Sequence, residues 1–129
     1  YLGTGKALDT YSDNSTHMSA TAGDYSGQYW KFTSLGDEYY RLTNRYLTEN
    51  ALDTYSECCG THMSATAGDY SGQYWRITSL DGGYCRLTNK YLTGYALDTN
   101  ADTHVPYMSE TAGDYSGQYW KFTAIETIQ

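Results

Sequence analysis

The apolar positions of this chain fall in short pieces in which apolar and polar side chains alternate. In residues 28–33, Trp30 and Phe32 share one face and Lys31 and Thr33 share the other, which is the period of a strand with one buried face. The same alternation runs through residues 40–44, and clusters of turn-forming residues lie at 13–15, 23–24, 36–37 and 81–83. Short alternating pieces bounded by turns predict strands and hairpins, and therefore an all-β fold class.

The pattern recurs with a fixed period of 45 residues. The string TAGDYSGQYW occurs unchanged at 21–30, 66–75 and 111–120, and an Ala-Leu-Asp-Thr tetrapeptide precedes it at 7–10, 51–54 and 96–99. A period of this length indicates one supersecondary unit that is built three times. The units are residues 1–45, 46–90 and 91–129 of one domain. About four strands per unit favour a closed architecture, because closure removes exposed sheet edges.

The third unit departs from the pattern at its end. Units one and two close with Tyr-x-Arg-Leu-Thr-Asn at 39–44 and 84–89, whereas the third continues from Ala124 to Gln129 without this segment. No such segment precedes Tyr1 either, so one of about twelve strands is unaccounted for. Either Ile125–Ile128 fill this position and close the barrel, or the sequence lacks a few native residues.

Composition limits the function classes. Leu, Ile and Val are sparse, and 16 tyrosines with three tryptophans supply much of the apolar bulk, which suits half-buried strands. The net charge of −7 and the scattered Lys and Arg argue against nucleic-acid binding. No stretch is apolar enough to enter a bilayer, so we expect no membrane insertion. Because the chain starts at Tyr1 and not at Met, we expect a processed, secreted, extracellular protein.

The cysteines are not part of the repeated framework. Cys58, Cys59 and Cys85 all lie in unit two and have no counterparts in the other units. An odd number leaves at least one thiol free or paired between chains, so their pairing stays open.

Three Gln-x-Trp motifs in register, each with an upstream Leu-Asp pair, resemble the ricin B-type (R-type) lectin family over essentially the whole chain. The resemblance implies a β-trefoil, in which six strands form a short barrel and three hairpins cap one end around a pseudo-threefold axis. It implies that the three motif tryptophans are structural core residues. These are Trp30, Trp75 and Trp120.

The resemblance also implies a sugar site in each unit. The Asp of the Leu-Asp pair would be the main sugar ligand, and the motif Gln would brace it. The sugar-binding residues are then Asp9, Asp53 and Asp98 with Gln28, Gln73 and Gln118. A carboxylate suits this role because it only accepts hydrogen bonds and can receive two hydroxyl donors at once. The alternative is a structural Asp that holds a turn.

At two positions in each unit, this chain lacks the residue with which the family commonly contacts the sugar. Where the family commonly has a sugar-binding Asn, this chain has Gly27, Gly72 and Gly117. Near the family's stacking aromatic, it has Ser19, Ser64 and Ser109. The repeated Gly-Asp-Tyr-Ser-Gly loop offers substitutes, since Tyr can stack on a sugar and Asp can accept its hydroxyl protons. These candidates are Asp24, Asp69, Asp114, Tyr25, Tyr70 and Tyr115, although the same loop could be only a tight turn.

The sequence gives little indication of catalytic or metal-binding chemistry. His17 and His62 are expected near the site, but Tyr107 replaces them in unit three, so packing at the loop edge is the favoured role. No nucleophile, base and orienting carboxylate recur together, and Cys58, Cys59 and His62 lack a fourth metal ligand. We therefore expect no catalysis, no cofactor and no metal.

The expected function is that of a multivalent lectin, or hemagglutinin. Up to three equivalent shallow sites would bind terminal galactose, N-acetylgalactosamine or N-acetylglucosamine on glycoproteins or glycolipids, and a homo-oligomer remains open. The alternatives are a carbohydrate-binding module of a glycoside hydrolase, a trefoil protease inhibitor acting through residues 100–106, and a ligand-free trefoil.

Overall fold

The computed structural model describes residues 6–20, 26–54, 60–66, 71–99, 103, 105–111 and 116–122. The strands are β1 (Lys6–Thr10), β2 (Thr16–Ala20), β3 (Trp30–Gly36), β4 (Tyr39–Asn44), β5 (Asn50–Thr54), β6 (Thr61–Ala65), β7 (Trp75–Ser79), β8 (Cys85–Asn89), β9 (Tyr95–Thr99) and β10 (Pro106–Glu110). Short 3₁₀ turns are η2 (Ser26–Gln28), η3 (Ser71–Gln73), η4 (Asp81–Gly83) and η5 (Ser116–Gln118). In this part of the chain, no helix is long and apolar enough to cross a membrane.

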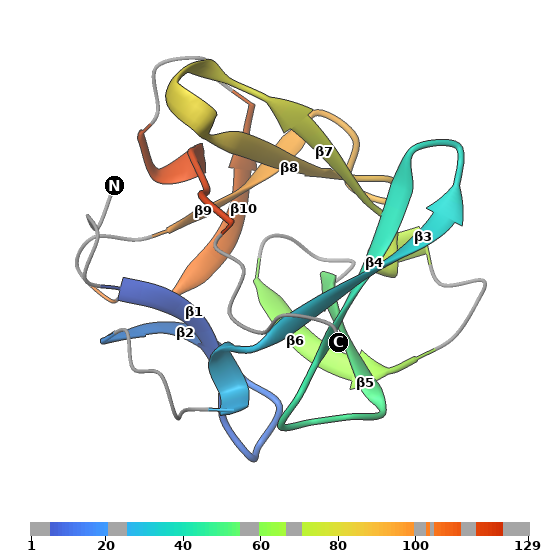
Figure 1. Ribbon diagram of the computed structural model, residues 1–129, viewed down its shortest axis with the longest axis vertical. Helices are drawn as coiled ribbons and strands as arrows, with labels where there is room; N and C mark the ends of the chain where they lie inside the picture. The colour runs from blue at the N-terminus through green and yellow to red at the C-terminus, as the bar shows by residue number, and fades with distance from the viewer. Residues whose placement is uncertain are drawn as a thin grey trace, which may run out of the picture.

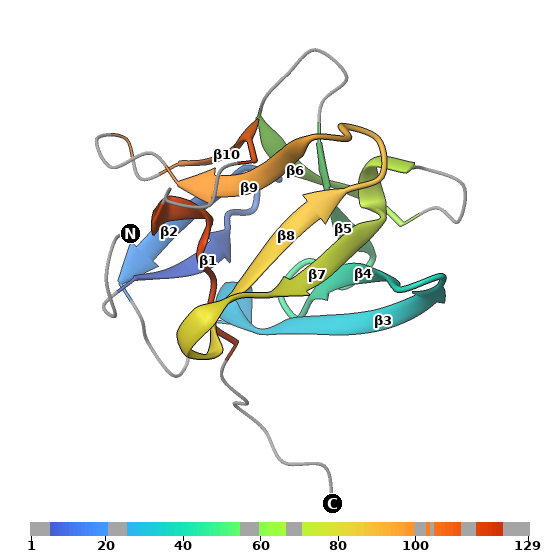
Figure 2. The same cartoon turned by 90° about the horizontal axis from the view of Figure 1, so that it is seen from above.

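The described elements form a β-trefoil, as the sequence predicts. Three hairpins, β1–β2, β5–β6 and β9–β10, lie around the centre of the molecule and cap it (Figure 1). The hairpins β3–β4 and β7–β8 form the described barrel strands, which lie beside one another below the cap in Figure 2. All of the strand pairs among the described residues are antiparallel, which allows neighbouring strands in the chain to be joined by short turns.

Adjacent units are joined in the barrel wall at the motif tryptophans. Trp75, the first residue of β7, lies opposite Tyr40 of β4 on one side and Asn89 of β8 on the other. Trp120 makes the equivalent bridge to Cys85, with backbone N–H···O distances of 2.7 and 2.8 Å in the two directions. Among the described strands, β3 pairs only with β4.

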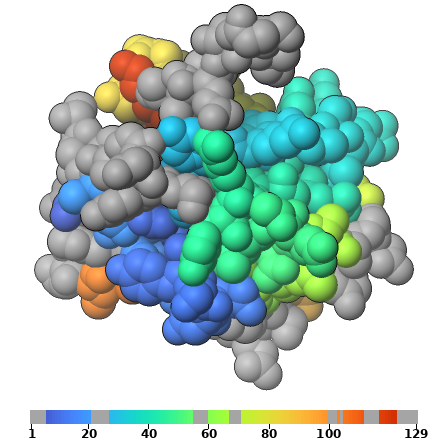
Figure 3. All heavy atoms as spheres, turned by 60° about the horizontal axis from the view of Figure 1, so that its bottom comes forward, coloured from blue at the N-terminus to red at the C-terminus, as the bar shows by residue number. Residues whose placement is uncertain are grey.

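The cap hairpins meet near the pseudo-threefold axis through equivalent positions. The hydroxyls of Thr16 and Thr61 lie 2.7 Å apart, and the Thr61 hydroxyl donates to the Pro106 carbonyl at 3.4 Å. Isolated bridges join Ser15 to His62 and Gly60 to Tyr107. The tip of the first hairpin also reaches unit two, since Asn50 Nδ2 donates to Asn14 Oδ1 at 3.1 Å, and these segments adjoin in Figure 3.

All three units contribute side chains to the core, and unit two contributes the most. The fully buried apolar cluster consists of Leu42, Leu52, Met63, Trp75, Leu87, Leu97 and Met108. The three tryptophans are not buried equally: Trp75 has no exposed surface, whereas Trp30 and Trp120 are partly buried and pack against the cluster. Of the three, Trp75 lies in a strand that is paired on both sides.

The predicted face alternation is confirmed in β3, where Trp30 and Phe32 are partly buried and Lys31 and Thr33 are exposed. The turns at 13–15, 36–37 and 81–83 are also present between strands. The loop at 23–24 and the segment Ile125–Gln129 lie outside the described residues.

We expect Trp75→Ala to destabilise the protein by about 3–5 kcal/mol, because it removes the largest fully buried side chain and leaves a cavity. Chemical denaturation measures this loss. The matched control is Tyr91→Ala, since Tyr91 is 46% exposed and its replacement should change stability by less than about 0.5 kcal/mol. Equal effects of the two variants would show that Trp75 is not a core residue.

Candidate functional site

The three candidate sugar-binding aspartates occupy equivalent places on the cap hairpins. Along β1, Leu8 packs against the core and Thr10 is buried opposite Thr16, so Asp9 lies on the other face of the hairpin. Its cross-strand neighbour is His17. The same register places Asp53 opposite His62 and Asp98 opposite Tyr107.

Each carboxylate is largely covered and strongly hydrogen-bonded. Asp9, Asp53 and Asp98 are 6%, 8% and 5% exposed. In each unit Oδ1 accepts the backbone N–H of the following threonine, at 2.8, 2.8 and 2.7 Å. Such bonds fix the orientation of the carboxylate.

The motif glutamines link the turn, the carboxylate and the second cap strand. Gln28 Nε2 lies 3.3 Å from Asp9 Oδ2, and Gln73 Nε2 lies 3.5 Å from Asp53 Oδ2. In unit three the link is indirect, because Gln118 donates to Ser109 Oγ at 3.0 Å and that hydroxyl donates to Asp98 Oδ2 at 2.6 Å. Each glutamine also donates to the carbonyl that ends its cap strand, at 2.8–2.9 Å. The structure thus brings each predicted Gln and Asp together in one network.

The glycines before these glutamines allow the close approach of the turn. A Cβ built on Gly27, Gly72 or Gly117 would overlap Oδ1 of the aspartate in the same unit. An Asn at this position, as in the resembled family, could not coexist with the carboxylate in its present place. This overlap explains why the chain has glycine at the position where the resembled family commonly has asparagine.

The motif tryptophans anchor the residue that precedes each aspartate. Trp30 Nε1 donates to the Leu8 carbonyl at 3.0 Å, and the equivalent bonds run from Trp75 to Leu52 and from Trp120 to Leu97 at 3.0 and 2.9 Å. Each tryptophan therefore combines a packing role with a bond that sets the position of the carboxylate.

Serine donors were not predicted as part of the site. Ser64 Oγ and Ser109 Oγ each donate to the neighbouring carboxylate at 2.6 Å. In unit one, Ser19 Oγ is buried and has no hydrogen-bond partner among the described residues, so these residues give Asp9 one donor fewer than Asp53. The recurrence of these serines at intervals of 45 residues is the sequence signal that could have identified them as donors. By itself, it indicates only that a stacking aromatic is absent.

Asparagines at the ends of two barrel strands were also missed. Asn44 Nδ2 donates to the Gly27 carbonyl and Asn89 Nδ2 to the Gly72 carbonyl, both at 2.9 Å. Their Oδ1 atoms accept the backbone N–H groups of Tyr46 and Tyr91 at 2.8 Å. Each Asn thus holds the glycine turn from the barrel side, and the repeated Arg-Leu-Thr-Asn string was its sequence signal.

Histidines lie beside two of the carboxylates. Burial lowers the pKa of His17 below its ordinary value of 6.5, against the opposing effect of nearby Asp9 and Asp13. Burial likewise lowers the pKa of His62, and Asp53 opposes it. The ring of Tyr11 lies beside that of His17. The structure therefore places both histidines next to the candidate site, as expected.

The remaining candidates lie outside the described residues: Asp24, Asp69, Asp114, Tyr25, Tyr70 and Tyr115, with Cys58 and Cys59. In the described part of the chain, no three His, Cys, Asp or Glu side chains are grouped to hold a metal ion. Cys85 is a free and partly buried thiol.

Comparison with known proteins supports the fold. No family model matches the chain, and neither does any curated protein. Among solved structures, the designed threefold-symmetric protein ThreeFoil is similar with a TM-score of 0.74 and 25% identity, over 91% of this chain and 89% of that one. A Clostridium perfringens endo-β-galactosidase that releases GlcNAcα1-4Gal has a TM-score of 0.80 at 17% identity over 93% of this chain. A Clostridium thermocellum exo-β-1,3-galactanase has a TM-score of 0.76 at 22% identity over 91%.

The matched lengths differ between these proteins. This chain spans 30% of the endo-β-galactosidase and 27% of the galactanase. At these identities, the likeness to the two enzymes shows a shared β-trefoil fold.

We expect Gly72→Ala to destabilise the protein by about 1–3 kcal/mol, because the added Cβ forces apart the turn and the Asp53 carboxylate. Thermal or urea unfolding measures the change. In an Asp53→Ala background the same substitution should cost clearly less, since the overlapping atom is gone. Additive effects in this double-mutant cycle would contradict the steric explanation.

We also expect acid to destabilise the fold through the two histidines. Their pKa values are lower in the folded state, so their contribution to stability is fully present above about pH 6.5 and is lost as the pH falls through the folded-state pKa values. Urea denaturation at about pH 7.5 and about pH 5 measures the slope. A His17→Gln, His62→Gln variant should show a shallower slope, and an unchanged slope would contradict this assignment.

Proposed function

We propose that this protein is a non-catalytic, secreted lectin of the R-type, which binds glycans through up to three equivalent sites on its cap hairpins. The observation that carries the proposal is the threefold recurrence of a fixed carboxylate, held on the same face of each hairpin by a threonine N–H and by the glutamine turn. A site repeated in three units can serve a repeated ligand such as the branches of a glycan.

The hydrogen-bond inventory leaves room for a sugar. A carboxylate offers roughly four acceptor positions. Among the described residues, Asp9 receives two donors, from Thr10 and Gln28, and Asp98 also receives two, from Thr99 and Ser109. Asp53 receives three, from Thr54, Ser64 and Gln73. The remaining positions can accept sugar hydroxyls, and a preorganised carboxylate loses little freedom when it does so.

Galactose-type sugars are the first ligands to test. Two proteins of similar fold, the endo-β-galactosidase and the exo-β-1,3-galactanase, act on galactose-containing glycans. N-acetylgalactosamine and N-acetylglucosamine complete the set that the family resemblance supports.

Multivalency would compensate for weak individual sites. A single partly exposed sugar site is expected to bind with a Kd on the order of tens of micromolar to millimolar. Three sites on one rigid body could raise the avidity for a glycan-coated surface by about 10² or more. Glycoproteins and glycolipids of cell surfaces are therefore the proposed partners, and agglutination is the expected effect.

A second candidate function is that of a carbohydrate-binding module in a larger glycoside hydrolase. The observation that favours it is that the chain matches only 30% and 27% of two glycan-degrading enzymes. The site would be the same in both cases. The full gene distinguishes them, because a module would share its reading frame with a catalytic domain.

Replacing all three aspartates by asparagine should abolish glycan binding, because a hydrogen bond to a charged group contributes about 1.5–3 kcal/mol, or roughly 10–100-fold per site. A glycan array with sugar-inhibited agglutination measures this effect, and circular dichroism checks the fold. The charge-matched control is Asp37→Asn, Glu49→Gln, Asp81→Asn, since these three residues are exposed on turns. Binding that survives in the Asp9, Asp53, Asp98 variant would refute the assignment of the site.

A further inference from the structure

The outward face of the described barrel strands carries cations and hydroxyls but no acids. The strands β3, β4, β7 and β8 contain no Asp or Glu, although the whole chain has 15 acidic residues. Their four cations alternate with core residues and therefore point outward, and each lies directly opposite a threonine. The pairs are Lys31 with Thr43, Arg41 with Thr33, Arg76 with Thr88 and Arg86 with Thr78. Cations that look scattered in the sequence are thus gathered on one wall of the fold.

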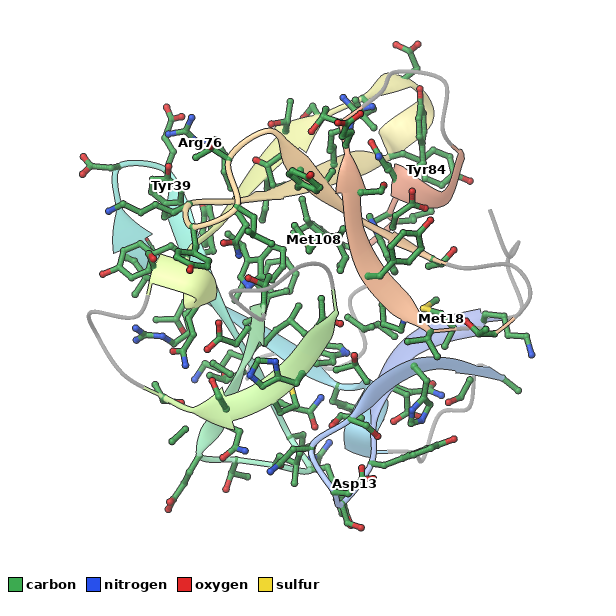
Figure 4. All side chains as sticks on the ribbon, turned by 180° about the vertical axis from the view of Figure 1, so that it is seen from behind. Asp13, Met18, Tyr39, Arg76, Tyr84 and Met108 are labelled. Carbon is green, nitrogen blue, oxygen red and sulfur yellow. The ribbon has the colours of Figure 1, made fainter. Side chains whose placement is uncertain are left out.

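Four side chains of this wall form a tyrosine–cation cluster where units one and two meet: Tyr39, Tyr74, Arg76 and Lys90. Tyr39 lies opposite Arg76 across the β4–β7 pair, and the guanidinium carbon of Arg76 is 4.8 Å from the centre of the Tyr39 ring (Figure 4). The Lys90 ammonium is 5.5 Å from the centre of the Tyr39 ring and 4.8 Å from that of Tyr74. The backbone N–H of Lys90 donates to the Tyr74 carbonyl at 3.0 Å, which fixes the strand end that carries this cation.

The cluster brings together two positive charges without an acidic partner. Arg76 and Lys90 are both exposed, and in the part of the chain that the structure describes neither forms an ion pair with a carboxylate. The tyrosine rings attract the cations and limit their movement, but they do not cancel the charge. At physiological salt, exposed charges more than about 8 Å apart are largely screened from each other. The local positive charge, and not the net charge of −7, therefore decides which ligands this surface attracts.

A second cluster of the same kind occurs where units two and three meet. The ring centres of Tyr84 and Tyr119 are 6.0 Å apart, and the Lys121 ammonium is 5.8 Å from the centre of the Tyr84 ring. At a distance of 45 residues, these three side chains are the counterparts of Tyr39, Tyr74 and Arg76. Cations at two neighbouring junctions suit a ligand whose anionic groups are repeated along a chain.

We propose that the tyrosine–cation cluster binds the sulfate groups of a sulfated polysaccharide, while the threonines of the same wall bind its hydroxyls. Arg76 suits a sulfate because a guanidinium presents two parallel N–H donors to two oxygens of one anion. A single-stranded nucleic acid fits less well, since its bases need open aromatic faces and Arg76 and Lys90 already lie over the rings. The surface is on the barrel wall and not on the cap hairpins, so it is a second binding surface beyond the proposed function.

The test uses dextran sulfate as the probe and uncharged dextran of equal length as its control, with the Kd measured by calorimetric titration. The unmodified protein should bind dextran sulfate and not dextran. The Arg76→Gln, Lys90→Gln variant should weaken this binding by about tenfold or more, because charge-assisted hydrogen bonds are lost. The matched control is Lys6→Glu, which changes the net charge equally but on cap strand β1, and its Kd should stay within about threefold.

The remaining outcomes would overturn the inference in different ways. If Lys6→Glu weakens binding as much as the double variant does, the attraction is a diffuse charge effect and the cluster is not a site. Displacement of dextran sulfate by excess methyl β-galactoside would place the sulfate on the cap hairpins. Equally tight binding of single-stranded DNA or of carboxylated hyaluronate would refute the preference for sulfate. If dextran sulfate does not bind at all, this inference fails, while the proposed function still depends on the binding of neutral glycans.

Discussion

The docking of the Gly-Gln-Tyr-Trp turn on the first cap strand is the interaction on which the rest of the structure depends. In each unit the glycine lets the turn approach the Asp carboxylate, and the tryptophan indole binds the carbonyl of the preceding leucine. Asn44 and Asn89 hold the same turn from the barrel side. Because barrel, turn and cap strand are joined at one place, the orientation of a cap hairpin and that of its carboxylate are set together.

This coupling explains how one segment serves both stability and the candidate site. A buried carboxylate is costly unless it is well hydrogen-bonded, and these three receive their donors from the elements that must be packed anyway. Each hydrogen-bond donor from within the protein also occupies an acceptor position on the carboxylate that a sugar hydroxyl could otherwise use. Units one and three have fewer such conflicts than unit two, because the described residues give Asp9 and Asp98 two donors each and Asp53 three. The three units therefore share a framework without having the same acceptor capacity.

Much of the fold could be predicted because the repeats and the alternation of apolar and polar residues are visible in the sequence itself. The 45-residue repeat and the strand alternation at Trp30 and Phe32 predicted a closed all-β fold of three units, and the resemblance of the Gln-x-Trp motifs to R-type lectins implied the trefoil. The role of Gly72 could not be predicted, since the reason for an absent side chain appears only when the opposing atom is placed. Identical letters also hide unequal burial: Trp75 is fully buried because β7 is paired on both sides, whereas Trp30 and Trp120 are partly buried.

The candidate site shows even more clearly which contacts cannot be predicted from the sequence. The Asp and Gln positions could be predicted from a known motif. Their hydrogen-bond partners Ser64 and Ser109 belong to no such motif, and the sequence shows only that they stand where the family has a stacking aromatic. Chain periodicity locates the framework that every unit must share. In the proposed function, recognition would depend on positions between the framework residues, where the sequences of the units differ, as Asn100 and Tyr107 in unit three illustrate.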